Sequence, residues 1–273
     1  MARRLVRLSV VAVLLGGFVL AGCVPPPTPS GPPLPDRIAA VGDSITAATD
    51  VGWCCVDPQG SHPQYSWSTG TSLVVNSHLR RIDALNGAKT VAALNAADPG
   101  ADSSDLQAQL LEASTFGAQY VTVLMGGNDL CWGPTPTEQF RQRVTAAFDA
   151  FFAASPDARL FVASVPNLYH LWSIEHDDPW SQLIWNLFNV CPTMLPSNVS
   201  DQQRQSILAL EVQFNDILAS ACAKYTNCRW DRNTVFNYQF TTSDISPVDH
   251  YHPSMQGQNT LAAITWSASF WGS

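Results

Sequence analysis

The sequence predicts an α/β fold in which helices cover both faces of a central parallel sheet. Four short apolar segments, each bounded by Gly, Pro, Asn or Asp, have the length of buried strands; they cover residues 37–41, 90–94, 120–125 and 159–165. Helical patterns fill the chain between and after these segments. Strands that alternate with helices are typical of parallel sheets, because each crossover places a helix over one face.

The first two helical patterns lie between the strands. Apolar residues at positions 106, 110 and 113 share one face of the first. The second begins at Thr135-Pro136-Thr137-Glu138, which has the pattern of a capping box with Pro at the first helical position. Its apolar face is made of Phe140, Val144, Phe148, Phe151 and Phe152.

Two further helices are expected after the last predicted strand. Ser200 and Gln203 are expected to cap the first of them, whose apolar face holds Ile207, Leu210, Phe214, Ile217 and Ala221. The other is expected over residues 256–270.

The N-terminus predicts export. Arg3, Arg4 and Arg7 precede an apolar run of 13 residues, 8–20, which suits a signal peptide and is shorter than the roughly 20 residues of a membrane-spanning helix. The run ends in Leu20-Ala21-Gly22-Cys23, which is similar to a bacterial lipobox. We therefore expect residues 1–22 to be a lipoprotein signal peptide and Cys23 to be lipidated; a plain secretory signal is the alternative.

The segment after Cys23 predicts a tether. Residues 24–35 hold seven of the 19 prolines, and such a composition favours an extended, semi-rigid chain. We expect residues 23–36 to link a lipid anchor in the membrane to a globular domain at 37–273. The predicted location is the cell surface, with a secreted protein as the alternative.

Composition excludes two classes of protein. With 46% apolar and 13% charged residues among 273, the chain can bury a large core and is not a disordered protein. Lys+Arg 14 against Asp+Glu 22 gives a net charge of −8, and loss of residues 1–22 with their three Arg would make it −11. A nucleic-acid binder needs a basic face, so no nucleic-acid partner is expected.

Six cysteines remain beside Cys23, and an even number in an exported chain suggests disulfides. The pairing of Cys222 with Cys228 would close a small loop at a helix end, and Cys131 with Cys191 would tether a long middle segment. The adjacent Cys54 and Cys55 could bridge each other, pair elsewhere or stay reduced. A zinc site is disfavoured because the chain has no CxxC pair.

Unusual residues gather in loops that follow the predicted strands, where α/β folds place their chemistry. In Gly42-Asp43-Ser44, the Ser lies between a strand and a helix and is a candidate nucleophile. It does not belong to the Gly-x-Ser-x-Gly pentapeptide of α/β-hydrolases, which is absent from the chain. Taken alone, the tripeptide is more typical of a capped turn.

A second candidate loop lies before the last helix, at Asp249-His250-Tyr251-His252-Pro253. An imidazole can take the proton of a serine hydroxyl, and a carboxylate on its other nitrogen fixes the tautomer. Asp249 and His252 could supply these two groups. Asp249 could instead cap a turn, or Asp249, His250 and His252 could be part of a metal site completed by His170, His176, Asp177 or Asp178.

The middle loops offer hydrogen-bond donors for a developing oxyanion. Gly126-Gly127-Asn128-Asp129 follows a predicted strand and supplies an amide side chain. Gly100 could present its backbone N–H to the same oxygen. Each loop by itself is more often a turn than a site.

Together these loops resemble the SGNH hydrolases, also called the GDSL esterase/lipase family. That family carries four sequence blocks: Gly-Asp-Ser, a lone Gly, Gly-x-Asn-Asp and Asp-x-x-His-Pro. Here the blocks occur in order within residues 37–270, as Gly42-Asp43-Ser44, Gly100, Gly126-Gly127-Asn128-Asp129 and Asp249-His250-Tyr251-His252-Pro253.

The resemblance implies a flavodoxin-like three-layer α/β/α sandwich and serine-hydrolase chemistry without a metal or organic cofactor. It implies Ser44 as nucleophile, His252 as base and Asp249 as the group that orients His252. The oxyanion hole would comprise the N–H groups of Ser44 and Gly100 and the side chain of Asn128. With Cys131 just after the third block, the chain is also similar to the exported, disulfide-containing bacterial branch.

Residues 166–200 form an apolar, aromatic segment before the long third helix. We favour a helical insertion that packs on the core, and a wall or lid of an acyl-binding pocket is compatible with it. The segment is rich in large side chains: Leu168, Tyr169, Leu171, Trp172, Trp180, Leu183, Ile184, Trp185, Leu187 and Phe188.

The leading hypothesis is an anchored esterase or lipase whose partner is a small-molecule or lipid ester. A carbohydrate O-acetyl esterase or an acyltransferase with the same catalytic residues is the second. A ligand-binding lipoprotein with a vestigial site is the non-enzyme alternative. The sequence does not predict the oligomeric state.

Overall fold

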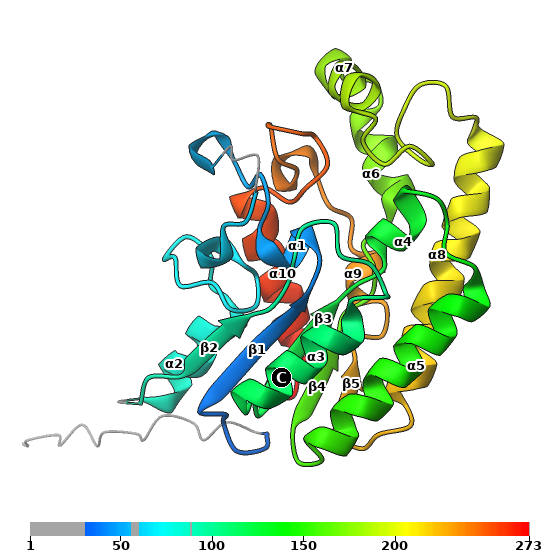
Figure 1. The fold of residues 1–273 in the computed structure, drawn as a ribbon. Helices are drawn as coiled ribbons and strands as arrows, with labels where there is room; N and C mark the ends of the chain where they lie inside the picture. The colour runs from blue at the N-terminus through cyan, green and yellow to red at the C-terminus, as the bar shows by residue number, and fades with distance from the viewer. Residues whose placement is uncertain (1–30, 56–59, 88, 273) are drawn as a thin grey trace, which may run out of the picture.

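The computed structural model describes residues 31–55, 60–87 and 89–272. Its centre is a parallel sheet with the strand order β2-β1-β3-β4-β5 (Figure 1). Every strand pairing is parallel, and the order is that of flavodoxin-like folds, so the expected fold class is confirmed. The strands are β1 Arg37–Gly42, β2 Ala92–Asn95, β3 Tyr120–Leu124, β4 Arg159–Val162 and β5 Cys228–Trp230.

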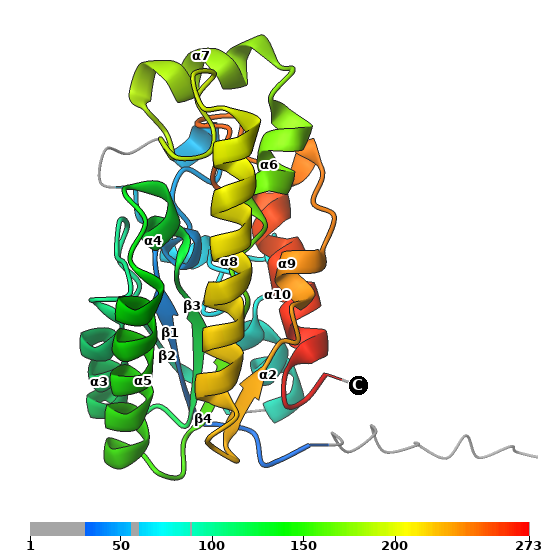
Figure 2. The same ribbon diagram turned by 90° about the vertical axis from the view of Figure 1, so that its right-hand side faces the viewer.

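Helices cover the two faces of this sheet (Figures 1 and 2). One face packs on α3 Leu106–Phe116, α5 Thr137–Ala154 and α8 Asp201–Cys222, and the other packs on α2 His78–Asn86, α9 Thr234–Asn237 and α10 Met255–Ala268. Alternate strand residues serve the two layers: Val121 and Val123 join the α3 side, whereas Tyr120 and Leu124 join the α10 side.

Four further helices lie at or beyond the carboxyl ends of the strands, with α7 at the top of Figure 1. They are α1 Ser44–Ala47, α4 Gly127–Cys131, α6 Leu168–Glu175 and α7 Pro179–Phe188. Single 3-10 turns occur at Trp53–Cys55, Pro63–Tyr65 and Thr242–Asp244. Within the described ranges, no helix combines the length and apolar character that a membrane crossing requires.

The element predictions are mostly confirmed, with corrections. The second strand begins at Ala92 rather than at 90. The three-residue β5 was missed, because it is too short to show a pattern. The fourth strand ends at Val162 rather than at 165. The capping box at Thr135 is wrong: α5 begins at Thr137, and the Thr135 hydroxyl donates to the buried Asp129 carboxylate at 2.8 Å. The capping box of Ser200 and Gln203 is confirmed at the start of α8.

The predicted signal peptide, Cys23 and most of the predicted tether lie outside the described residues. The described end of that tether lies against the body of the protein. Trp271 donates its indole N–H to the Pro32 carbonyl at 2.8 Å, and Leu34 packs on the core cluster of the α10 side.

Three disulfides are formed within the described chain. Cys131–Cys191 and Cys222–Cys228 follow the predicted pairings, and of the alternatives for Cys54 and Cys55 the structure has the bridge between neighbours. The Cys131–Cys191 bridge joins the end of α4 to the chain after α7. It therefore fastens the 166–200 segment to α4, the helix that carries Asn128.

Candidate active site

The candidate residues from distant loops line one open cleft at the carboxyl end of the sheet, as parallel α/β folds lead one to expect. The cleft has a volume of about 620 Å³, and its lining includes Ser44, Gly100, Asn128, Asp249 and His252. The expected convergence of these loops is thus met in the structure.

Ser44 is the first residue of α1, and its loop is held rigidly. Gly42 has a φ of +154°, and a Cβ there would lie 2.4 Å from the Leu124 carbonyl oxygen, so only glycine fits. The Gln109 side chain holds Gly42 from both sides, accepting from its N–H at 2.8 Å and donating to its carbonyl at 3.0 Å. Asp43 caps α1 by accepting the Ile45 N–H at 2.9 Å.

His252 connects the serine to a carboxylate. Its Nε2 lies 2.7 Å from Ser44 Oγ, and its Nδ1 is hydrogen-bonded to Asp249 Oδ2. The other oxygen of Asp249 accepts the backbone N–H groups of Tyr251 and His252, each at 3.0 Å. Because the carboxylate requires the proton on Nδ1, Nε2 is the acceptor that faces the serine hydroxyl.

The electrostatics of this pair suit a base. Burial by itself would lower the pKa of His252, but the neighbouring Asp249 carboxylate outweighs it, and the pKa lies above its usual value. Burial would likewise raise the pKa of Asp249, but His252 and the backbone donors hold it below its usual range. The carboxylate therefore stays ionised and stabilises an imidazolium when one forms.

Asp43 is a second titratable group beside this pair. Burial raises its pKa to about 6, against the opposing effect of the Ile45 N–H, and its charge interacts with that of His252. The charge of Asp43 adds to that of Asp249 in raising the pKa of His252, with a smaller effect.

Hydrogen bonds connect the two segments that carry Gly100 and Asn128. Asn128 donates through Nδ2 to the Ala101 carbonyl at 2.8 Å, and Ser103 donates to Asp129 through its N–H at 2.8 Å and its hydroxyl at 2.6 Å. These bonds hold Gly100, which has a φ of +86°, beside α4. Since the first N–H groups of a helix have no intrahelical acceptor, that of Ser44 is a third donor at this edge of the cleft.

The segment 166–200 forms α6 and α7, and both interpretations of it apply. Leu171 and Trp185 are buried in the core, as expected for a packed insertion. Ile184, Phe188 and Val190 line the cleft, as expected for a wall. Trp132, which is 60% exposed, also lines the cleft.

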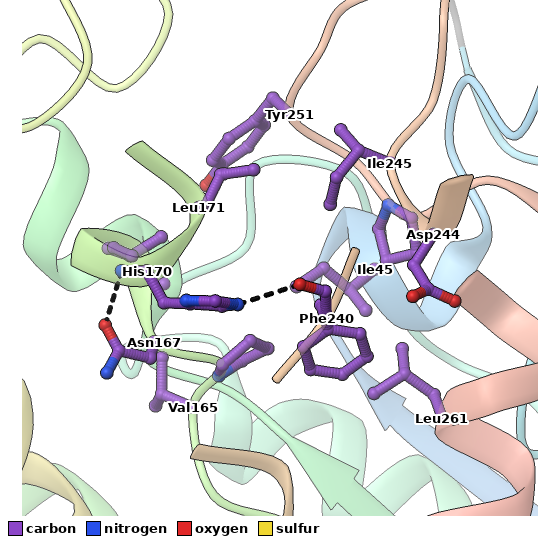
Figure 3. A pocket seen from close by; sticks show the side chains of 14 residues that line it. Ile45, Val165, Asn167, His170, Leu171, Phe240, Asp244, Ile245, Tyr251 and Leu261 are labelled. Carbon is purple, nitrogen blue, oxygen red and sulfur yellow. Dashed lines mark hydrogen bonds between the residues drawn. The ribbon is translucent and has the colours of Figure 1, made fainter. Parts of the chain in front are cut away.

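An apolar pocket lies next to the cleft, and Tyr251 lines both (Figure 3). Figure 3 shows Tyr251 at one end of this pocket and Phe240 and Leu261 at the other. The pocket is small, about 50 Å³. One wall is fixed by His170, whose Nε2 is hydrogen-bonded to the Phe240 carbonyl at 2.8 Å.

The alternative of one metal site from the 249–252 loop does not fit the arrangement of the described residues. His252 faces Ser44, whereas His250 turns away to Glu175 and Asp178. His170 bonds a backbone carbonyl, and the side chain of His176 lies 3.4 Å from Asp177. Potential ligand atoms thus fall into separate groups, Asp50 with Asp249 and His252, and Glu175 with Asp178 and His250.

Sequence reasoning missed the buried polar residues that support the site. Gln109 holds the Ser44 loop, and Gln258 of α10 holds the same segment by donating to the Ile45 carbonyl at 2.7 Å and accepting the Trp67 N–H at 2.9 Å. A polar residue on an otherwise apolar helix face was the available signal, since Gln109 lies on the face of Leu106 and Leu110.

Comparison with known proteins gives a family and a fold. The model of the GDSL-like lipase/acylhydrolase family matches residues 40–259. No curated protein matches the chain.

Solved structures with this fold have low sequence identity to the chain. An extracellular lipase from Streptomyces rimosus is 19% identical, with 85% of this chain and 99% of that chain covered at a TM-score of 0.50. A phospholipase A1 from Streptomyces albidoflavus NA297 is 15% identical, with 85% and 99% covered at 0.52. A family two carbohydrate esterase from Clostridium thermocellum, solved in complex with cellohexaose, is 15% identical, with 85% and 62% covered at 0.50.

Proposed function

The chain belongs to the GDSL-like lipase/acylhydrolase family, and on that premise we propose that it hydrolyses carboxylic esters through an acyl-enzyme on Ser44. One observation carries the proposal: His252 Nε2 lies 2.7 Å from Ser44 Oγ while its Nδ1 is bonded to Asp249. A serine hydroxyl is a weak nucleophile until a base takes its proton. This arrangement supplies that base in the correct tautomer.

The proposed reaction has two acyl-transfer steps. Ser44 Oγ attacks the ester carbonyl carbon as His252 takes the hydroxyl proton, and the resulting oxyanion accepts from the N–H groups of Ser44 and Gly100 and from Asn128. The C–O bond to the alcohol then breaks, and the alcohol leaves with the proton from His252. Water, deprotonated by His252, attacks the acyl-enzyme, and Ser44 recovers its proton as the acid is released.

The cleft and its neighbouring pocket support an aliphatic acyl ester, of a lipid or a smaller compound, as the substrate. Ile184 and Phe188 give the cleft an apolar wall, and the pocket beyond Tyr251 is lined mainly by apolar side chains such as Val165 and Leu261. Apolar walls around a few convergent polar groups are typical of ligand sites. The pocket of about 50 Å³ suits only the end of a chain, so we assign most of the acyl group to the cleft.

Two alternatives remain distinguishable by experiment. A carbohydrate O-acetyl esterase or an acyltransferase would use the same Ser44, His252 and Asp249, and it would be favoured by faster turnover of acetylated sugars or by transfer to an added alcohol. A ligand-binding lipoprotein with a vestigial site is disfavoured, because Ser44, His252 and Asp249 are hydrogen-bonded in the order that catalysis requires.

The proposal is tested with a panel of p-nitrophenyl esters from acetyl to dodecanoyl, a phospholipid and an acetylated xylan, for the wild type and Ser44→Ala. We expect turnover of at least one acyl ester by the wild type, a loss of about 10⁶-fold in Ser44→Ala and no effect of a chelator. Turnover that persists in Ser44→Ala would remove Ser44 as the nucleophile. Inhibition by the chelator would restore the metal alternative.

We also propose that the enzyme is exported and held at the cell surface through Cys23. The disulfides of the described chain are compatible with an oxidising compartment. Radiolabelled palmitate should enter the full-length protein and not Cys23→Ala, and the variant should appear in the medium. Equal labelling of the two proteins would contradict the anchor.

A further inference from the structure

His250 lies inside the catalytic loop but faces away from the catalytic serine. Its neighbours in sequence, Asp249 and His252, make the bonds to the site, whereas its own Nδ1 lies 2.8 Å from Ser181 Oγ and 3.0 Å from Glu175 Oε2. These partners belong to α7 and α6, the helices that wall the cleft. The mechanism proposed above gives His250 no task.

The cluster around His250 contains two buried groups and one partly exposed carboxylate. Glu175 and Ser181 are 5% and 0% exposed, and Asp178 Oδ2 lies 3.7 Å from the same imidazole nitrogen. The Ser181 hydroxyl lies 2.6 Å from Glu175 and 2.9 Å from Asp178, and it has one proton to donate. Because carboxylates only accept, His250 Nδ1 serves as the donor that completes the cluster.

The backbone of His250 is held by the same helices. Its φ of +56° lies in the left-handed region, which costs a residue with a side chain free energy unless surrounding contacts impose it. The carbonyl of His250 accepts the indole N–H of the fully buried Trp185 at 3.1 Å. Both the side chain and the peptide of His250 are therefore fixed by α6 and α7.

This attachment contributes to the position of His252, together with the bond from the Ser246 N–H to the His252 carbonyl at 2.8 Å. The turn 249–252 is closed internally, because the N–H groups of Tyr251 and His252 donate to Asp249 Oδ1, and His250 links this turn to α6 and α7. A shift of this turn would carry His252 away from Ser44. The helix α7 that holds His250 also supplies Ile184 and Phe188 to the cleft, so one link sets the base and the apolar wall relative to each other.

We propose that His250 is a positioning residue, which fastens the 249–252 turn to α6 and α7 and thereby keeps His252 aligned with Ser44; the proposal rests on the esterase function proposed above. It acts through His252 and does not touch the substrate. Displacement of a catalytic group by about 1 Å can cost about 100-fold in rate, which sets the size of the expected effect.

The test compares variants that separate the contacts from the backbone strain. His250→Gly removes the side chain and tolerates the left-handed backbone, and we expect kcat to fall about 100-fold with an increased KM for long acyl esters. His250→Asn also tolerates that backbone and offers an amide donor to Ser181 and Glu175; it should recover most of the lost kcat. His176→Ala is the matched control, because its imidazole contacts backbone carbonyls, the exposed Asp177 and the ring of Trp172, and it should keep kcat within about twofold.

A double-variant cycle tests whether the contact is the cause. Glu175→Gln should lower kcat in the wild type but hardly change it in His250→Gly, because interacting residues are not additive. Thermal unfolding of each variant shows whether the protein is folded. The proposal is overturned if folded His250→Gly keeps kcat within about threefold of the wild type. It is also overturned if His250→Asn does not restore kcat and the losses of kcat caused by His250→Gly and Glu175→Gln multiply in the double variant. A wild type without any Ser44-dependent turnover would overturn the esterase function, and this proposal with it.

Discussion

His78 and His252 both have little contact with solvent, but His78 lies in the core of the protein, whereas His252 lines the candidate active-site cleft. His78, in α2, is fully buried among the rings of Trp67, Phe161 and Trp266, and its nitrogens lie 2.9 Å from the hydroxyls of Tyr120 and Thr265. Burial, together with the charge of the nearby Arg81, lowers its pKa to about 3.

His252 responds differently because one of its partners is charged. Its side chain is 12% exposed, and burial acts on it in the same direction, yet Asp249 holds its pKa above the usual value. A neutral hydroxyl satisfies an imidazole without favouring its charged form, whereas a carboxylate favours the imidazolium. The comparison teaches that the charge of the partner, and not burial alone, sets the direction in which the pKa of a buried histidine shifts.

The largest expected effect separates the two histidines by function. His252→Gln should lower kcat/KM for a reactive p-nitrophenyl ester by about 10⁵-fold or more, because members of a triad act as a unit. His78→Gln should keep the activity of the folded enzyme within about threefold, since its contacts lie in the core. Steady-state kinetics on both variants test this contrast, which a similar loss of kcat/KM in the two variants would contradict.

Asp249→Asn is expected to make His252 resemble His78. The amide keeps the shape but removes the charge, so kcat should fall by about 10⁴-fold. Because the carboxylate raises the pKa of His252 and burial lowers it, that pKa should decrease in the variant. Activity requires the neutral imidazole, so the acid limb of kcat/KM against pH should move to lower pH. An unmoved limb, or one displaced upward, would contradict the assigned role of Asp249.

His78 should make stability depend on pH. Its pKa of about 3 in the folded state lies below the ordinary 6.5, so between these values the unfolded chain binds more protons. The free energy of unfolding should therefore fall as the pH drops from 6.5 to 3, by on the order of 4 kcal/mol from this group. Urea titrations should show the stability of the wild type relative to His78→Gln shrinking in acid. A constant difference would mean that His78 is not held neutral.

The smallest expected effects concern the tyrosine beside each histidine. Tyr120 donates or accepts through its hydroxyl at His78, so Tyr120→Phe leaves a buried nitrogen without that partner and should cost about 1–3 kcal/mol of stability. Tyr251 meets His252 with its ring, 4.8 Å between centroids. Tyr251→Phe keeps the ring and should change kcat/KM by less than about threefold. Thermal unfolding and ester kinetics on both variants test the prediction. It would be refuted if Tyr251→Phe lost more stability than Tyr120→Phe, or if Tyr251→Phe lost more than about threefold in kcat/KM.

Much of the catalytic side of this comparison could be predicted from the sequence. Ser44, Asn128 and the Asp249–His252 turn belong to short motifs whose residue types are distinctive, and the positions of Ser44 and Asn128 just after strands indicate that they lie at one edge of the sheet. The helices that cover the sheet, such as α8, could also be predicted, because the 3.6-residue periodicity of an apolar face is visible within a single segment.

The partners of the buried polar side chains could not be predicted, because they depend on contacts between segments that are distant in the sequence. Nothing local to His78 indicates that Tyr120 and Thr265 will enclose it. Thr135 looked like a helix cap but is used by Asp129, and His250 looked like a partner of His252 but joins Glu175. In each case a buried polar group elsewhere in the chain provided a better partner than the local one.

The most direct test of the account is covalent labelling with a fluorophosphonate, which reacts with a serine that a neighbouring base has activated. Peptide mass spectrometry should find a single adduct on Ser44 in the wild type, strongly slowed labelling in His252→Gln and none in Ser44→Ala, with His78→Gln labelled like the wild type. An adduct on another residue, or equal labelling of the wild type and His252→Gln, would contradict the claim that His252 activates Ser44.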